Sequence, residues 1–137
     1  MMDMLAIGRQ VLDTQGFSRL LGTEMTAYSP EGVELRLPMR AELQQQNGFA
    51  HGGVVSYLAD NALTFAGGAA MGIGVLTAEY KINYVRPGVG VALVARAQVL
   101  YAGKSLATCR CDVFSVLEDG TEKLCATAQG TIAKTGG

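Results

Sequence analysis

The stretch NGFAHGGVVSYLADNAL, from Asn47 to Leu63, holds the groups that could do chemistry in this chain. A histidine and two glycines stand ahead of a run of small and apolar residues. Asp60 interrupts that run and is the only Asp, Glu, Lys or Arg between Glu42 and Glu79. A charged side chain in apolar surroundings is costly unless it has a partner or a function. Asp60 is therefore a candidate catalytic carboxylate.

The two glycines, Gly52 and Gly53, stand where a helix would begin. Backbone N–H groups in the first turn of a helix lack partners within it and lie at the positive end of its dipole. Glycine also lets another molecule come close to them. Such donors can stabilise an oxyanion, and a carboxylate can attack a carbonyl or activate water. The pattern predicts acyl transfer to water, although a plain helix start followed by a hydrogen-bonded aspartate would give the same letters.

The spacing of these groups adds a condition. Gly52 and Asp60 are eight residues apart, so one helix would separate them by about 12 Å along its axis. They cannot both touch one carbonyl. A second copy of the helix, antiparallel to the first, would place Asp60 of each chain beside the glycines of its partner across a two-fold axis. An enzyme of this kind must be at least a dimer, with two sites at the subunit boundary.

Hydrophobic periodicity predicts the elements around this segment. Residues 1–22 follow a helix-like pattern with breaks at Gly16 and Gly22. Residues 23–39 read as two short strands about the turn SPEG. We therefore expect an N-terminal helical segment followed by a hairpin.

A helix is predicted from Gly52 to about Gly67, and the glycine-rich stretch GGAAMGIG should end it. One stripe of this helix is apolar and the opposite side is polar. The apolar stripe contains Val54, Leu58, Ala62 and Phe65, and the polar side contains Ser56, Asp60 and Thr64.

Four runs of alternating residues follow, separated by turn signals, and predict a consecutive antiparallel sheet. They span residues 76–86, 91–101, 105–117 and 122–133. In the second run one apolar face should pack on the helix, and it holds Val91, Leu93, Ala95, Ala97, Val99 and Tyr101. The plan is α+β, with a sheet wrapped around one long helix, in a single domain over residues 1–137.

Composition excludes several classes of function. The net charge of −1 and pI of about 5.8 give no basic surface for nucleic acid. No apolar stretch reaches the roughly 18 residues that cross a bilayer, and the acidic start is unlike a signal peptide. We expect a cytoplasmic protein without a membrane partner.

Three cysteines, Cys109, Cys111 and Cys125, lack the spacing of a metal site, and His51 is the only histidine. We expect no metal, and we expect the thiols to behave as small buried hydrophobic groups.

The stretch QQQNGFAHGGVVSYLADNAL, continued by TAEYKINYVRPG, resembles the hotdog-fold acyl-CoA thioesterases, in particular the phenylacetate-degradation type. The similarity extends from Thr23 to Ala133, and the HGG with an acidic residue nine positions after the histidine is fairly specific. The resemblance implies a strongly curved antiparallel sheet around a long helix, with dimers that pair the sheets edge to edge. Many members form tetramers. No cofactor is implied beyond the coenzyme A of the substrate.

The resemblance also implies roles for residues near the motif. Gly52 matches the backbone donor that polarises the thioester carbonyl, and Asp60 of the partner chain matches the nucleophile or general base. His51 is similar to the histidine that shapes the site, although a hydrogen-bonded residue at the start of the helix is the alternative. Gln45 holds the place of an amide near the catalytic water, which Asn47 could fill instead.

Further positions are open to two interpretations. Thr77 matches a residue that positions water but is also a good strand former. Gly53, Arg86 and the GKS segment Gly103, Lys104 and Ser105 resemble substrate contacts, including those to the phosphates of coenzyme A. Arg86 and GKS could equally be solvated turns. A phosphate-binding loop around GKS is excluded, because Gln98 stands where that motif needs glycine and a strand follows.

Two other functions share the same plan. A hotdog protein that binds acyl-CoA without turnover would keep the cleft, and a hotdog dehydratase or hydratase would use a histidine and an acid as a proton-transfer pair. Asp60 together with HGG speaks against the first, and the motifs of the hydratase type are absent. The acyl group stays open between a phenylacetyl-like and a medium aliphatic chain, because Phe49, Tyr57 and Phe65 fit either.

Overall fold

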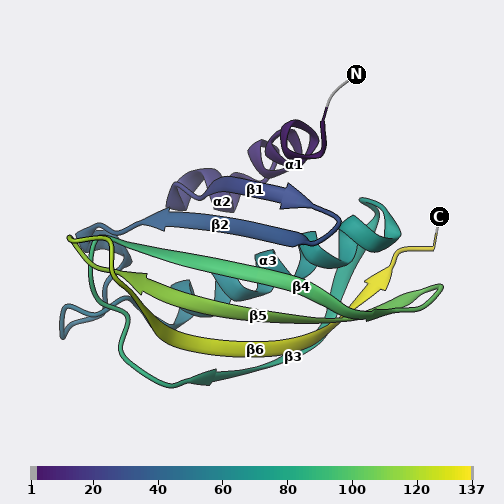
Figure 1. Ribbon diagram of the computed structural model, residues 1–137. Coiled ribbons are helices and arrows are strands. Elements are labelled where there is room, and N and C mark those ends of the chain that lie inside the picture. Colours follow the sequence, from purple (N-terminus) through teal and green to yellow (C-terminus); the bar gives the residue numbers. More distant parts are fainter. Residues whose placement is uncertain (1–2, 137) are drawn as a thin grey trace.

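The computed structural model describes residues 3–136, in which an antiparallel sheet wraps one long helix (Figure 1). Residues 1 and 2 of the predicted helical segment, and residue 137, lie outside this range. The elements in chain order are α1 (Met4–Asp13), α2 (Gly16–Leu21), β1 (Glu24–Ser29), β2 (Gly32–Pro38), a 3-10 turn (Ala41–Leu43), α3 (Gly52–Met71), β3 (Val75–Tyr84), β4 (Ala92–Ala102), β5 (Leu106–Val116) and β6 (Glu122–Lys134).

The sheet has the order β1-β2-β4-β5-β6-β3, and every neighbouring pair is antiparallel. The expectation of four consecutive paired strands was wrong for β3, which pairs with β6 and not with β4. The reason is that β2 of the N-terminal hairpin already pairs with β4. The segment 85–91 carries the chain from β3 at one edge of the sheet to β4 inside it.

Helix α3 begins at Gly52 as predicted but continues to Met71. The predicted end near Gly67 was wrong, because Gly67 is a packing residue and not a break. A Cβ atom at Gly67 would come within 2.6 Å of the Ile132 side chain on β6, so glycine allows the helix and sheet to approach closely. The helix ends at Gly72, which has φ of 97°.

The face of α3 that meets the sheet is apolar, as the periodicity predicted. Leu58, Ala62 and Phe65 are buried, whereas Val55 is more deeply buried than the predicted Val54. Opposite them on β4, the buried residues are Leu93, Ala95 and Ala97, with Val99 partly buried against the core.

Two residues of the predicted β4 face lie outside the core. Val91 precedes the strand and is exposed. Tyr101 is exposed because the register shifts between Val99 and Tyr101, which turns its side chain away from the helix.

The three cysteines are free and buried, as expected for small hydrophobic groups. Burial raises the pKa of the Cys109 thiol to about 11 and that of Cys111 to about 12. Both therefore remain protonated at neutral pH.

The N-terminal segment forms two helices that lie beside β1, at the sheet edge opposite β3 (Figure 1). Gly16 is the first residue of α2, so the predicted break falls just before it. Gly22 ends α2 in the left-handed conformation, with φ of 90°. Within residues 3–136 no helix is long and apolar enough to span a bilayer.

Candidate active site

Asp60 lies half-buried in the middle of α3, where hydroxyl groups fix its position. Thr77 of β3 donates a hydrogen bond to Asp60 Oδ1 at 2.6 Å. Thr64, one turn later on α3, donates to the Asp60 backbone carbonyl at 2.8 Å and lies 2.8 Å from the Thr77 hydroxyl. The predicted polar side of the helix therefore faces β3, and Ser56 continues it through a 2.6 Å hydrogen bond with Tyr80.

The second carboxylate oxygen, Asp60 Oδ2, accepts none of the hydrogen bonds found within residues 3–136 and is not buried from solvent. Asp60 also takes part in none of the ion pairs of that range. Asp60 is hydrogen-bonded, as the simpler interpretation expects, but by the Thr77 hydroxyl and through one of its two oxygens. Thr77 thus orients one oxygen, and the other is open to solvent.

At the start of α3, the N–H groups of the two glycines differ in their hydrogen bonds. His51 precedes the helix, and its Nδ1 accepts a 2.8 Å hydrogen bond from the Gly53 N–H. The Val54 and Val55 N–H groups donate to the His51 carbonyl. Among the hydrogen bonds of residues 3–136, none is donated by the Gly52 N–H. The Gly52 N–H is thus a first-turn donor without a partner in that range.

The imidazole of His51 is oriented by this cap. Since Nδ1 accepts, the proton of the neutral ring lies on Nε2, which can donate outward. His51 therefore has the capping role proposed as the alternative, and the cap leaves its other nitrogen available.

A hollow of about 360 Å³ opens beside Gly52. Tyr84 at the end of β3 forms part of its wall and donates a 3.1 Å hydrogen bond to the Gly52 carbonyl. The predicted site residues Gln45, Gly52 and Arg86 meet around this hollow. The remaining wall residues are Phe49, Ala50, Val55, Val85, Pro87, Gly88 and Cys125.

The loop before the helix is organised by Gln45. Its side-chain oxygen accepts hydrogen bonds from the Asn47 and Phe49 N–H groups. Its amide nitrogen is then the end left to donate. Asn47 is exposed and is not part of the wall of the hollow.

A single chain does not bring all predicted residues together. Gly52 and Asp60 lie on the same helix, about 12 Å apart along its axis. The two β3 residues that contact them, Tyr84 and Thr77, are seven residues apart, which is roughly 23 Å in an extended strand.

The GKS segment lies at the other end of the sheet from Arg86. Gly103, Lys104 and Ser105 form the turn between β4 and β5. This turn adjoins the beginning of β3, because the Ser105 carbonyl accepts from the Lys134 N–H and Lys134 pairs with Val75.

Sequence reasoning missed Tyr84, Thr64 and Tyr80 as residues that contact the site. Thr64 carried a signal, since it shares the polar side of the predicted helix with Asp60. The two tyrosines carried none, because tyrosine is an ordinary strand residue.

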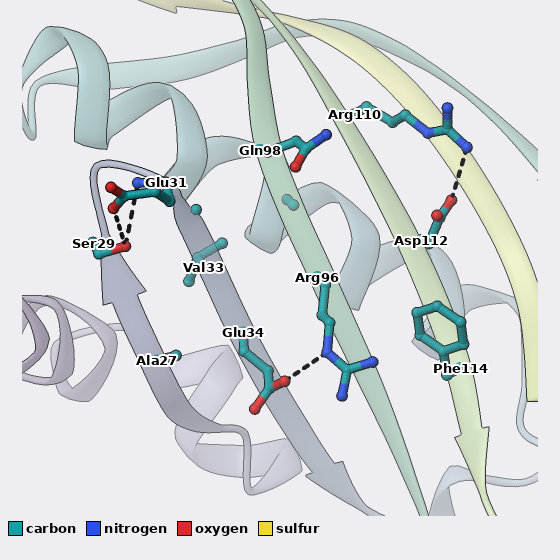
Figure 2. A pocket seen from close by; sticks show the side chains of 12 residues that line it. Ala27, Ser29, Glu31, Val33, Glu34, Arg96, Gln98, Arg110, Asp112 and Phe114 are labelled. Carbon is teal, nitrogen blue, oxygen red and sulfur yellow. Dashed lines mark hydrogen bonds and ion pairs between the residues drawn. The ribbon is translucent and has the colours of Figure 1, made fainter. Parts of the chain in front are cut away.

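Another hollow, about 410 Å³ in volume, lies on the outer face of the sheet (Figure 2). Its arginines are already paired with carboxylates. Arg96 bonds Glu34 and Glu122, which raises its pKa, and Arg110 lies 3.6 Å from Asp112. This groove therefore offers no unpaired cation for a phosphate.

Comparison with known proteins agrees with this geometry. A model of the thioesterase superfamily matches residues 47–121. A thioesterase family protein from Silicibacter pomeroyi is 32% identical, with a TM-score of 0.86 and coverage of 91% of this chain and 93% of that chain. A mutant of the phenylacetic acid degradation protein PaaI from Thermus thermophilus is 29% identical, with a TM-score of 0.76 and coverage of 88% of this chain and 99% of that chain.

A third structure shares the fold. Thioesterase HI1161 from Haemophilus influenzae has a TM-score of 0.81 at 24% identity, with coverage of 97% of this chain and 90% of that chain. The predicted resemblance is thereby confirmed. The chain belongs to the thioesterase superfamily and has the hotdog fold of its solved relatives.

Proposed function

We propose that this protein hydrolyses an acyl-CoA thioester to the free acid and coenzyme A, at a site shared by two chains. One observation carries the proposal: each chain offers an oriented carboxylate with a free oxygen and an unpaired backbone N–H, at two places too far apart to meet. Asp60 supplies the first and Gly52 the second.

The edge strand β3 supports the assembly. One side of β3 pairs with β6, and the other has no strand partner within residues 3–136. A ten-residue strand with an open edge is a template for pairing with another chain. An antiparallel pair of β3 strands with its two-fold axis at the middle of the strand would bring Thr77 of one chain near Tyr84 of the other. Asp60 then comes beside Gly52 of the partner subunit.

Exposed apolar residues fit this arrangement. Ile73 and Leu76 lie at the beginning of β3 and Tyr84 and Val85 at its end, and each is more than half exposed. Antiparallel pairing brings the beginning of one strand to the end of the other, so these side chains would cover one another. The dimer is the unit that the chemistry requires, and tetramers would be pairs of such dimers.

In the proposed reaction the thioester oxygen accepts a hydrogen bond from the Gly52 N–H, which stabilises the negative charge that develops on it. Asp60 Oδ2 either attacks the carbonyl carbon or removes a proton from water that attacks. Both routes break the C–S bond, and the sulfur leaves as coenzyme A. The first route forms an anhydride that water then hydrolyses. Thr77 holds Asp60 in place for either route.

Other predicted residues receive supporting roles. Gln45 is better placed than Asn47 to donate to the attacking water, because its side chain lines the hollow beside Gly52. His51 is the residue before Gly52, and its Nδ1 cap engages the Gly53 N–H at the start of the helix. In the proposed dimer, Arg86 lies at the same end as Gly103, Lys104 and Ser105 of the partner subunit, where the coenzyme A phosphates would bind.

A complementation experiment tests the shared site. The variant Asp60→Asn lacks the carboxylate function, and Gly52→Pro lacks the N–H. In a mixed dimer, one site holds both changes and the other holds neither. Equal amounts of the two chains, unfolded and refolded together, should therefore recover about a quarter of wild-type activity by random pairing, although each variant alone is nearly inactive.

The assay is release of free coenzyme A, detected with a thiol-reactive dye. The control is a mixture of the two variants folded separately and combined just before the assay. A mixture that stays as inactive as its parts after joint refolding, while wild type treated alike regains activity, would show that the site is not shared between chains.

A further inference from the structure

A second hollow adjoins the catalytic carboxylate. It has a volume of about 130 Å³ and lies between α1, α3, β1 and the beginning of β3. Thr64 forms part of its wall and bonds both the Asp60 carbonyl and the Thr77 hydroxyl. The hollow thus begins next to the groups that hold Asp60.

The walls of this hollow are mostly apolar and are held in place. Val11, Phe65 and Val75 line it. Tyr28 lines it as well, packs edge-on against Phe65 with ring centroids 5.6 Å apart, and donates a 2.6 Å hydrogen bond to the Phe65 carbonyl. Ile73 is 72% exposed and stands at the rim.

The outer wall comes from the N-terminal helices, outside the part of the chain that the family model matches. Gln15 lines the hollow, and its side-chain oxygen accepts hydrogen bonds from Ser18 at 2.6 Å and Asn61 at 3.0 Å. Asn61 follows Asp60 on α3. This partly buried polar contact fixes the N-terminal helices against the helix that carries the carboxylate.

Gly68 lines the hollow between Tyr28 and Val75. Its φ angle is not positive, and a Cβ atom there would lie 3.4 Å from the Tyr28 hydroxyl and 3.7 Å from Val75, which are ordinary contacts. Neither the backbone nor packing within the chain requires glycine at this position, and glycine is unfavourable inside a helix. Gly67 differs, because a Cβ atom there would overlap Ile132. What the glycine at position 68 gives is space between Tyr28 and Val75.

We propose that this hollow binds the acyl group of the substrate, that Gly68 sets its depth, and that the enzyme prefers thioesters of compact acyl groups. An apolar cavity of about 150 Å³ holds one benzene molecule, so 130 Å³ suits a phenyl ring or a short aliphatic chain of similar volume. Long chains exceed it. This inference rests on the proposed thioesterase function and adds the substrate class.

The test compares wild type with Gly68→Val, which fills the hollow, and with Ala70→Val, which adds the same kind of side chain to an exposed position of α3. The rate kcat/KM is measured for acetyl-, hexanoyl-, phenylacetyl- and decanoyl-CoA. For wild type we expect kcat/KM for decanoyl-CoA to be on the order of tenfold or more below kcat/KM for phenylacetyl-CoA. In Gly68→Val the ratio of phenylacetyl to acetyl activity should fall on the order of tenfold, and in Ala70→Val it should not change.

The proposal is overturned if folded Gly68→Val keeps the wild-type ratio, or if Ala70→Val shifts it equally. If wild type hydrolyses none of these thioesters, the proposed function has failed and the hollow is tested separately with phenylacetamide. A rise in melting temperature in wild type that is lost in Gly68→Val then supports an acyl-sized pocket. The absence of a rise in wild type, or an equal rise in both proteins, refutes it.

Discussion

Gly52→Pro removes one hydrogen atom from the proposed reaction and little else. Proline lacks the N–H and is favoured at the first position of a helix, where Gly52 stands. His51 has φ of −60° and ψ of 136°, which is the extended conformation that a residue before proline adopts. Because the Gly52 N–H bonds nothing else in residues 3–136, the free energy of unfolding should stay within about 1 kcal/mol of wild type.

The effect on catalysis should be large. Loss of one oxyanion donor costs roughly 10²-fold to 10³-fold in kcat, or about 2.7 to 4 kcal/mol. The measurement is kcat from coenzyme A release, beside a thermal melt that shows the variant to be folded.

The matched control is Gly52→Ala, which keeps the N–H. The added Cβ atom would meet the Tyr84 ring at no less than 3.8 Å, so this chain has room for it. If Gly52→Pro turns over at nearly the wild-type rate, Gly52 is not the oxyanion donor. If Gly52→Ala loses as much activity as Gly52→Pro, the loss comes from crowding and the reasoning from the N–H is wrong.

Further predictions concern the carboxylate, its support, the helix packing and the buried thiols. Asp60→Asn should lower kcat by on the order of 10² or more without loss of fold, and wild-type turnover in a folded variant would remove Asp60 from the mechanism. Thr77→Val should lower kcat roughly tenfold with little change in KM, because the carboxylate loses its orienting hydroxyl; an unchanged kcat would contradict this. Gly67→Ala should lower the free energy of unfolding by about 1 to 3 kcal/mol through overlap with Ile132, whereas Gly68→Ala should be neutral or stabilising, and equal denaturant midpoints for the two would contradict the packing argument. Burial raises the pKa of the Cys111 thiol from 9.0 to about 12. The contribution of this thiol to the free energy of unfolding is therefore complete below pH 9. It should be lost as the pH rises toward 12, at up to about 1.4 kcal/mol per pH unit. Denaturant unfolding at pH 8 to 11 should show a shallower decline in Cys111→Ala than in wild type, and parallel declines would refute the assignment.

Local patterns predicted local features of this chain well. The start of the long helix and the polar side that holds Ser56, Asp60 and Thr64 followed from the helical period alone. The hairpin about SPEG followed from turn chemistry. Each of these depends on residues close in sequence, where steric and periodic rules act directly.

Features set by distant residues were missed. The position of β3 depends on which strands compete for β4, and the length of α3 depends on Ile132, which meets Gly67 from the far end of the chain. The turned side chain of Tyr101 depends on a bulge that alternation does not reveal.

Some features of the candidate site could likewise be predicted from the sequence, and others could not. Periodicity isolated Asp60, and the distance to Gly52 required a second chain. Thr77 was a candidate only through the family resemblance, as a residue that positions water, and its hydrogen bond to Asp60 was not predicted. That His51 engages Gly53 and leaves Gly52 unpaired was visible only in three dimensions, because it depends on the rotation of one side chain.

The burial of the three thiols has a practical consequence for watching this molecule move. A thiol-reactive reagent added to the native protein can reach them only when the structure opens, so each labelling rate reports how often its surroundings separate. Cys109 and Cys111 would follow the opening of the strand β5 under the helix, and Cys125, which borders the hollow at Gly52, would follow that end of the molecule. Substrate analogues that bind in the hollow should lower the labelling rate of Cys125 before those of the other two cysteines. The labelling rate of Cys125 would therefore report whether the hollow is occupied.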